Sequence, residues 1–515
     1  LVLGGGPAGA WAAWKAASEG ARVVLADKGY CGTSGSAAAG GNNVWYVPPD
    51  PQKRELAKRS REARGGYLSD REWMDRVLDR AYVNVNQLGD WGYPFPLDEG
   101  GAPQRGSLQG PEYMRLMRKK VLGAGVRILD HSPALELLVD NDGVAGARGV
   151  RRQEGTRWRV TAGAVVIATG GCAFLSKALG LNVLTGDGGL LAAEAGAEMS
   201  GMEFSNAYAL APSFASVTKG FMYTWASFYG ADGKKLEGGG PLDRRTLVAR
   251  GLERGPVFAQ LDQAPAHAHA WMRSAQPNFF LPFDRAGVDP FRDRFAVTLR
   301  FEGTVRGTGG IRIVGADCRT SVPGLYAAGD AATRELICGG VTGGGSHNAA
   351  WAMSSGWWAG EGAARFGQTQ PRARAPRPTA HTPSASAGRS LDTEGLVRAI
   401  QAEVLPFDRS LFREEEGMRR SRARLEQLWT EVRGPTGGGT REVVRARELV
   451  AMVATARWMF DAALARRESR GMHLRTDHRE QDPAQQRRLL SGGLEHTWVR
   501  PDLEGVRGQG TEAVA

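Results

Sequence analysis

The sequence predicts an α/β fold: a Rossmann-like domain interrupted by an inserted α+β capping domain and followed by a C-terminal helical domain. Three observations predict this fold. The chain opens with an apolar run and a glycine-rich turn, Gly4-x-Gly6-x-x-Gly9. Two later segments, 164–171 and 322–330, also end an apolar run at glycines. Apolar residues recur at helical spacing within 391–470, which indicates the helical domain.

The first turn is surrounded by the elements that a dinucleotide site requires. Residues 1–3 predict the tail of a buried strand, 8–20 a helix and 22–26 a second strand. The glycines let the backbone approach a pyrophosphate at the positive end of the helix. Asp27 ends the second strand, where a carboxylate can accept hydrogen bonds from a ribose. The order predicts a dinucleotide site but does not identify the dinucleotide.

Composition limits the class of protein. The 515 residues suffice for two to four domains, and 42% hydrophobic residues is ordinary for globular cores. No run of about 18 apolar residues occurs, so we expect no transmembrane segment. The four cysteines lack CxxC spacing, which argues against an iron–sulfur cluster, a structural zinc or a disulfide scaffold in this chain and favours free thiols in a reducing cytoplasm. We expect no metal site.

Charge and the chain start lead to two further expectations. The formal charge of +11 comes from basic residues, largely Arg, dispersed among acids, so we expect an anionic substrate or an acidic partner and no nucleic acid. The chain has no initiator Met and starts inside a predicted strand, so we expect its natural start to lie upstream. A targeting signal ahead of residue 1 therefore stays open.

Changes in composition divide the chain. Aromatics, prolines and charges with little periodicity fill the region between 200 and 305, which favours an inserted segment covering a substrate. Linker composition rich in Pro, Arg, Ala, Thr and Ser follows Gly367. The expected divisions are 1–200 and 306–366 for the two parts of the cofactor-binding domain, 201–305 for the cap, 367–390 for a linker and 391–515 for the C-terminal helical domain and tail.

Several motifs, taken in order, resemble the flavoprotein subunits of the fumarate reductase and succinate dehydrogenase superfamily. This superfamily includes L-aspartate oxidase and the adenylylsulfate reductase alpha subunit. The motifs are Gly4-Gly-Gly-Pro-Ala-Gly9 with Asp27-Lys28, Ser34-Gly-Ser-Ala-Ala-Ala-Gly-Gly41, Ala168-Thr-Gly-Gly171, Thr185-Gly-Asp-Gly188, Ala195-Gly-Ala-Glu-Met-Ser-Gly-Met-Glu-Phe204, Pro323-Gly-Leu-Tyr-Ala-Ala-Gly-Asp330 and Arg467-Glu-Ser-Arg-Gly-Met-His-Leu-Arg475 with Asp477. The resemblance covers nearly the whole chain and implies a Rossmann-like FAD-binding domain under a mobile cap.

The resemblance also implies where FAD binds and how it reacts. Hydride or electron transfer would occur at flavin N5, and Asp330 would hold the ribitol. Ser34 stands where covalent members of the family have a histidine, which implies non-covalent FAD. The implied FAD-binding residues are Gly4, Gly6, Pro7, Ala8, Gly9, Asp27, Lys28, Ser34, Ser36, Gly40, Gly41, Ala134, Ala168, Thr169, Gly170, Asp187, Gly329, Asp330, Gly345 and Ser346.

The resemblance places Arg245 at the proton-donor position of fumarate reductases and Arg250 at the next arginine of that pattern. An arginine can act as an acid only if desolvation and nearby charge help it lose a proton. The alternative for Arg244, Arg245 and Arg250 is a solvated or phosphate-facing side of a helix.

The residues that grip a dicarboxylate in the family are replaced. Its two histidines correspond to Tyr208 and Val305, and one arginine corresponds to Val341. Succinate and fumarate are therefore not expected as substrates. The stretch Gly345-Ser-His-Asn348 is more similar to the Ser-Pro-His-Lys stretch of adenylylsulfate reductase alpha subunits than to true fumarate reductases.

Four residues could replace the missing ones around an anionic or aromatic ligand. They are His347, Arg306, Tyr208 and Trp225. Each also has a structural alternative: a helix cap for His347, surface or packing contacts for Arg306 and Tyr208, and core packing for Trp225. His473, in the C-terminal motif, has an interdomain structural role as the alternative to catalysis.

These inferences predict a cytoplasmic FAD-dependent oxidoreductase that reduces or dehydrogenates a small anionic metabolite. Because this chain lacks cysteines with cluster spacing, an iron–sulfur or ferredoxin-type partner would exchange electrons with it. One alternative is an adenylylsulfate-reductase-like alpha subunit working with a ferredoxin-type beta subunit, whose flavin would react with sulfite. The other is a flavin-binding regulatory or assembly protein without turnover.

Overall fold

The structure is a computed structural model of the chain. It describes residues 1–98, 100–218, 220–238, 244–341, 346–370, 375–379, 391–434 and 438–503.

A five-stranded parallel sheet forms the centre of the Rossmann-like part, with strand order β16-β9-β1-β2-β5. Val2 lies opposite Leu25 on one side and Val166 on the other. The segments 1–9 and 164–171, which both end a strand at glycines, are therefore neighbours in one sheet. The strands are β1 (Val2–Leu3), β2 (Val24–Ala26), β5 (Arg127–Leu129), β9 (Val165–Ile167) and β16 (Leu325–Ala327). The predicted order of strand, helix and strand at the start of the chain is confirmed, although β2 is shorter than expected.

Helices pack closely on this sheet because small residues face one another. Helix α1 (Pro7–Ser18) begins with proline, whose missing N–H costs nothing at a first helical position. It packs on α10 (Ser346–Thr369), where a Cβ on Gly360 would lie 2.3 Å from the Ala12 carbonyl oxygen. This close approach holds α1 against α10. The other helices up to the first strands of the cap are α2 (Pro51–Arg64), α3 (Arg71–Asp90), α4 (Gly110–Gly123) and α5 (Asp187–Glu194), and α9 (Glu335–Cys338) follows β16.

Smaller sheets surround the parallel one. The sheet β17-β6-β7-β8 combines Arg377–Pro378, Ala134–Asp140, Gly143–Val150 and Arg157–Thr161. The sheet β15-β10-β18-β19 combines Gly310–Ile311, Met199–Ser200, Leu489–Gly492 and Trp498–Pro501, and so joins the end of the chain to its middle. A two-stranded sheet pairs β3 (Gly41–Asn43) with β4 (Ser107–Gln109).

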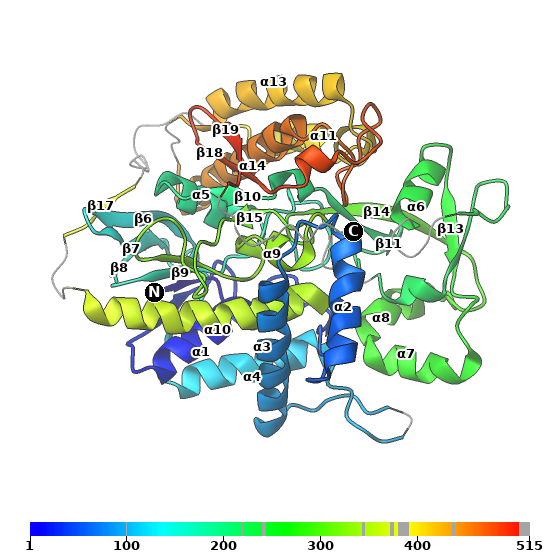
Figure 1. Cartoon of the computed structure of the whole chain (residues 1–515), viewed down its shortest axis with the longest axis horizontal. Helices are drawn as coiled ribbons and strands as arrows, with labels where there is room; N and C mark the ends of the chain where they lie inside the picture. The colour runs from blue at the N-terminus through cyan, green and yellow to red at the C-terminus, as the bar shows by residue number, and fades with distance from the viewer. Residues whose placement is uncertain are drawn as a thin grey trace, which may run out of the picture.

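The region expected to lack periodicity contains an antiparallel sheet with the order β11-β14-β13-β12. Its longest strand, β14 (Phe295–Gly303), alternates buried and half-buried residues over its first six positions, a period-2 pattern that was not recognised in the sequence. The other strands are β11 (Ala207–Pro212), β12 (Ser227–Tyr229) and β13 (Val257–Gln260). The helices are α6 (Arg244–Leu252), α7 (His269–Ala275) and α8 (Pro277–Ala286), which Figure 1 shows beside β13 at one end of the molecule.

Helices dominate the C-terminal part, as predicted. They are α11 (Thr393–Val404), α12 (Phe407–Ser410), α13 (Glu415–Val432) and α14 (Thr440–Ala465). Figure 1 shows α11, α13 and α14 gathered on one side of the molecule. Within the described ranges, no helix combines the length and the apolar composition needed to cross a lipid bilayer.

A buried ionic network attaches the C-terminal motif to the rest of the fold. Arg466 lies 2.7 Å from Glu203 and 2.8 Å from Glu468, and Glu468 also pairs with Arg470 at 2.6 Å. All four side chains are buried. Since an isolated buried charge is costly, each member needs the others. The Glu-Ser-Arg-Gly motif therefore holds the C-terminal helices against the region of Glu203.

Candidate functional site

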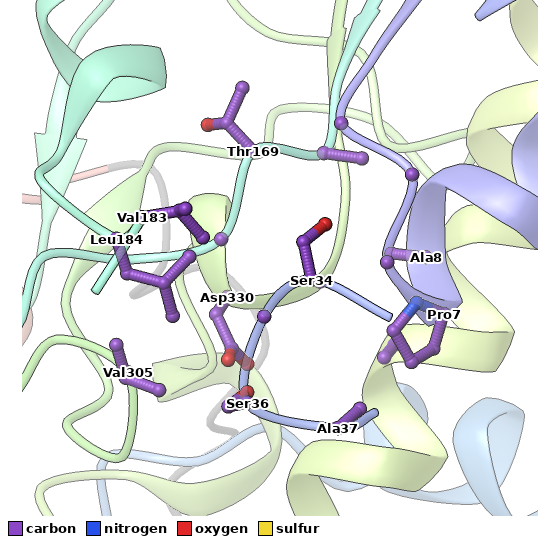
Figure 2. A pocket seen from close by; sticks show the side chains of 18 of the residues that line it. Pro7, Ala8, Ser34, Ser36, Ala37, Thr169, Val183, Leu184, Val305 and Asp330 are labelled. Carbon is purple, nitrogen blue, oxygen red and sulfur yellow. The ribbon is translucent and has the colours of Figure 1, made fainter. Parts of the chain in front are cut away.

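A pocket of about 1430 Å³, open solvent at its mouth included, lies where parallel strands end. Leu3, Ala26 and Ala168 line it at or directly after the ends of β1, β2 and β9, and Gly329 lines it shortly after β16. Ligands of open α/β sheets bind at this edge. Figure 2 shows Pro7 and Ala8 on one side of the pocket, Val183, Leu184 and Val305 on the other, and Ser34, Ser36 and Asp330 between them.

The glycine-rich turn forms one wall of the pocket, and its glycines meet two different demands. Gly4 has φ +102, and a Cβ there would lie 2.3 Å from the Ala168 carbonyl oxygen. A Cβ on Gly9 would lie 1.8 Å from the Gly4 carbonyl oxygen. Gly6, by contrast, has nothing within 4 Å of an added Cβ, so it leaves open space in front of α1. This is a cradle that a pyrophosphate can enter at a helix N-terminus.

Asp27 holds the turn and the next loop together. Its carboxylate accepts hydrogen bonds from the Gly5 N–H at 2.5 Å, the Gly29 N–H at 2.7 Å and the Ser34 hydroxyl at 2.9 Å. The side chain lines the pocket although the residue is only 6% exposed. The acid thus holds the glycine-rich turn and the loop after β2 together at the pocket wall.

Lys28 links the pocket to the C-terminal helices. Its ammonium group lies 2.8 Å from Asp187 and 2.6 Å from Glu448, and it donates a hydrogen bond to Thr185 at 2.7 Å. Burial favours the neutral amine, but the two carboxylates outweigh it and raise the pKa of Lys28. Lys28 therefore stays charged at this edge of the pocket.

Asp330 lines the pocket next to a buried arginine. Arg334 is fully buried and donates to Asp330 at 2.6 Å and to the Thr304 carbonyl oxygen at 2.7 Å. These contacts connect the loop after β16 to the segment that follows β14. The carboxylate is held in place and can accept hydrogen bonds from a polyol.

A charged cluster lies at the part of the pocket next to the β11–β14 sheet. Glu302 and Arg306, which line the pocket, pair at 2.9 Å, and Thr218 donates to Glu302 at 2.6 Å. Arg245 is partly buried on α6 and is close enough for the charges of Arg306 and Glu302 to shift its pKa. Burial, and then the charge of Arg306, lowers the pKa of Arg245 to about 10, while Glu302 opposes the shift. Two guanidinium groups around one carboxylate leave net positive charge.

The residues present fit FAD. Besides the glycine cradle and the two carboxylates, Asn348 lines the pocket with a buried Oδ1 that has no hydrogen-bond partner among the described residues. Its amide group donates to the Val305 carbonyl oxygen at 3.1 Å, so the side chain is held in place. Such an oxygen can accept a hydrogen bond from a cofactor.

The structure brings most of the predicted FAD-binding residues to this pocket. Those on its wall are Gly4, Gly6, Pro7, Ala8, Asp27, Lys28, Ser34, Ser36, Gly41, Ala134, Ala168, Thr169, Gly170, Asp187, Gly329 and Asp330. Three others do not line it. Gly9 supports the turn from behind, the Gly40 carbonyl oxygen accepts from Gly110 at 2.9 Å, and Ser346 bonds His347 at 3.1 Å. Gly345 lies outside the described residues.

The predicted substrate-binding residues separate into two groups. Arg306 lines the pocket, whereas Arg245 does not, although it is close enough to Arg306 for that charge to lower its pKa. His347 is buried behind the wall, where the Arg61 guanidinium donates to its ring at 3.1 Å and Trp45 packs on it at 4.4 Å between ring centroids. The next two residues, Asn348 and Ala349, reach the pocket instead of His347.

Tyr208 is directed away from the pocket. Its hydroxyl donates to the Leu405 carbonyl oxygen at 2.9 Å, and its ring packs between Phe301 and Phe407. The residue is 2% exposed and anchors β11 to the C-terminal helices. Because those contacts occupy both its hydroxyl and its ring, we do not retain it as a substrate ligand.

Four further residues have structural contacts of the kind given as their alternatives. Arg250 pairs with Glu253 at 3.1 Å on the surface, and Arg244 approaches the Thr224 carbonyl oxygen at 3.5 Å. Trp225 packs edge-on against Phe221 and Trp271. His473 is buried and accepts from Arg413 at 2.6 Å, and burial followed by the adjacent Arg413 lowers its pKa well below the usual value.

Several lining residues were missed in the sequence. Thr218 and Glu302 come from the cap segment, and Leu179, Leu181 and Val183 come from the loop before α5. A signal existed only for Glu302, a charged residue near the end of a strand whose neighbours are buried. The leucines of an irregular loop have no pattern that would assign them to a pocket.

Comparisons with known proteins agree with this geometry. The family model described as FAD binding domain matches residues 1–215, and the model described as fumarate reductase flavoprotein C-term matches residues 402–500. One of the subunits of fumarate reductase (CoM/CoB) from Methanothermobacter marburgensis is 24% identical over 540 residues, which cover 95% of this chain and 96% of that protein.

Two solved structures share the fold over almost the whole chain. Quinol fumarate reductase of E. coli superposes with a TM-score of 0.81 at 20% identity, over 97% of this chain and 95% of that chain. Adenylylsulfate reductase of Archaeoglobus fulgidus superposes with a TM-score of 0.79 at 19% identity, over 97% of this chain and 94% of that chain. The two likenesses are nearly equal, so the fold alone does not distinguish the two reactions.

Proposed function

We propose that the chain, an FAD-dependent oxidoreductase of the fumarate reductase and succinate dehydrogenase flavoprotein superfamily, acts on a small anionic substrate. The substrate would lie between FAD and the cap segment 201–305. The carrying observation is the ion pair of Arg306 with Glu302 on the pocket wall, with the further positive charge of Arg245 nearby. One carboxylate cannot balance two guanidinium groups, so the cluster favours an anion at this part of the pocket.

The residues suggest separate roles for the two arginines. Arg306 uses its Nε toward Glu302, and we assign its remaining N–H groups to a carboxylate of the substrate. Arg245, whose pKa burial lowers to about 10, is the better proton donor of the two. Bound FAD would supply hydride or electron transfer. Thr218 would keep Glu302 in place through its hydrogen bond.

The remaining parts of the proposal concern the cofactor and the partner. Ser34 bonds Asp27 rather than offering an imidazole to the flavin, which supports non-covalent FAD. The described thiols are all free and buried, so they supply no exposed cluster ligands. We propose that electrons pass to or from an iron–sulfur or ferredoxin-type partner, and that residues 1–200 and 306–366 form the two parts of the FAD-binding domain.

A substrate screen tests the function directly. Purified holoenzyme is reduced anaerobically and offered enones and enoates, or kept oxidised and offered saturated acids and amino acids, while flavin absorbance is followed. We expect at least one anionic compound to change the flavin redox state. Sulfite that perturbs the flavin spectrum, with no response to carbon substrates, would instead favour the adenylylsulfate-reductase-like alternative. Protein that takes up FAD but responds to none of these compounds would contradict the proposal.

Adjacent arginines then provide a matched test of the proton donor. Arg245→Ala is expected to lower kcat about 10²–10⁴-fold with a smaller change in KM, because a general acid acts only in the transition state. Arg244→Ala removes the same charge one residue earlier, where the guanidinium only approaches the Thr224 carbonyl oxygen, and should keep kcat within about twofold. Equal losses in both variants would remove Arg245 from the proposal.

A further inference from the structure

A second hollow adjoins the FAD pocket at Lys28. It measures about 1020 Å³ with the open solvent at its mouth included, and Lys28 and Val183 line both spaces. Its charged lining consists of Lys28, Arg152, Arg441, Arg445 and Glu448. We call it the basic hollow. Nothing in the oxidoreductase chemistry above uses it.

Positive charge in the basic hollow is incompletely balanced. Glu448 is shared, with Lys28 at 2.6 Å on one oxygen and Arg445 at 2.6 Å on the other. Within the described ranges, the one hydrogen bond that Arg152 donates goes to the Lys28 carbonyl oxygen, at 3.3 Å. Among the described residues, no acidic side chain pairs with Arg152 or Arg441. A concave surface with unpaired arginines attracts anions.

Helix α14 adds to this charge. Arg441 and Arg445 lie one turn apart at its start, and the N-cap residue Gly439 offers no side chain to the first N–H groups. The positive end of a 26-residue helix thus lies beside Arg441. Arg152 comes from the loop after β7, so an anion here would join the first part of the chain to the C-terminal helices.

The rest of the lining is different in character. Leu175, Val183 and Val444 supply apolar surface, and Asn182 supplies an exposed amide. A free phosphate has no apolar surface that could be buried against these side chains. A flat heterocycle would cover the apolar side chains, and the amide can donate to and accept from its edge.

We propose that the basic hollow binds a nucleoside phosphate, with its phosphates on Arg152, Arg441 and Arg445 and its base against Leu175, Val183 and Val444. Arginine forks suit phosphate oxygens, and a ligand that bridges two parts of the fold stabilises both. The site is separate from the FAD cradle at Gly4–Gly9, because the two spaces meet only at Lys28 and Val183.

Calorimetric titration of the FAD-saturated holoenzyme tests this assignment at low ionic strength. ADP should bind one to one, more tightly than pyrophosphate, with adenosine weaker still. Arg441→Gln and Arg152→Gln should each weaken ADP roughly tenfold, because each removes a charge-assisted contact. Arg424→Gln is the control: it removes an exposed arginine of α13 whose side chain bonds Gln427, and it should leave ADP affinity unchanged.

Four outcomes would overturn the proposal. ADP affinity that is the same in Arg441→Gln and Arg152→Gln as in the unaltered chain would remove the hollow as its site. Equal loss in Arg424→Gln would indicate unspecific attraction to a basic protein. Release of FAD by ADP, followed by the rise in free flavin fluorescence, would place ADP in the flavin pocket instead. Pyrophosphate that binds as tightly as ADP would overturn the assignment of a nucleoside.

Discussion

The two parts of the flavin pocket are built in different ways. The wall around Gly4, Gly6 and Gly9 consists of backbone, and its shape depends on the absence of side chains. The part beside the cap consists of side chains from separate segments: Thr218 from a loop, and Glu302 and Arg306 at the end of β14 and after it, with Arg245 of α6 close enough to be influenced by their charges. A backbone cradle suits a cofactor common to a whole superfamily, whereas side chains can be exchanged to change a substrate.

The largest effect should break the backbone wall. Gly4→Ala places a Cβ 2.3 Å from the Ala168 carbonyl oxygen at φ +102, so the turn must move and FAD should be lost from the purified protein. Gly20→Ala is the control, since Gly20 has a similar φ of +84 but open space around its Cβ. It should cost about 1 kcal/mol of unfolding free energy and keep the flavin. The measurements are flavin absorbance per chain and thermal unfolding; a fully yellow Gly4→Ala variant would contradict the comparison.

This difference explains how much the sequence could predict. Glycines at fixed spacing between a strand and a helix restrict the backbone to one shape, so Gly4, Asp27 and the wall around them were predictable from local pattern. Tyr208 and His347 were not, because which face of β11 or of α10 reaches the pocket depends on packing against distant segments. Glu302 joins Arg306 only through the turn after β14, a geometry that residue types alone do not specify.

A smaller effect should sharpen the comparison at the side-chain part. Glu302 raises the pKa of Arg245 against the lowering by burial and Arg306. When the enzyme reduces its substrate, the protonated guanidinium is the active acid, so turnover in that direction should fall as pH rises through about 10 in the unaltered chain. Glu302→Gln removes the opposing charge, lowers the pKa of Arg245 further, and should move this fall to lower pH.

The measurement for Glu302→Gln is the pH dependence of kcat with the substrate found in the screen. Glu253→Gln is the control, because Glu253 pairs with Arg250 on the surface of the same cap segment. It should leave the fall of kcat at alkaline pH where it is in the unaltered chain. If that fall stays in place in Glu302→Gln, or moves equally in both variants, Glu302 does not control the protonation of Arg245.

The smallest effect concerns Ser34, a side chain that supports the backbone wall of the pocket through its hydrogen bond to Asp27. Ser34→Ala removes one of three hydrogen bonds to the Asp27 carboxylate while the Gly5 and Gly29 N–H groups remain. It should weaken FAD binding by about 1 kcal/mol, or roughly fivefold in Kd. In both proteins acid precipitation should release all the flavin, because no covalent bond holds it. Flavin retained in the acid pellet of the unaltered chain would contradict non-covalent attachment, and flavin lost altogether from Ser34→Ala would show that one side chain controls the wall as strongly as its glycines do.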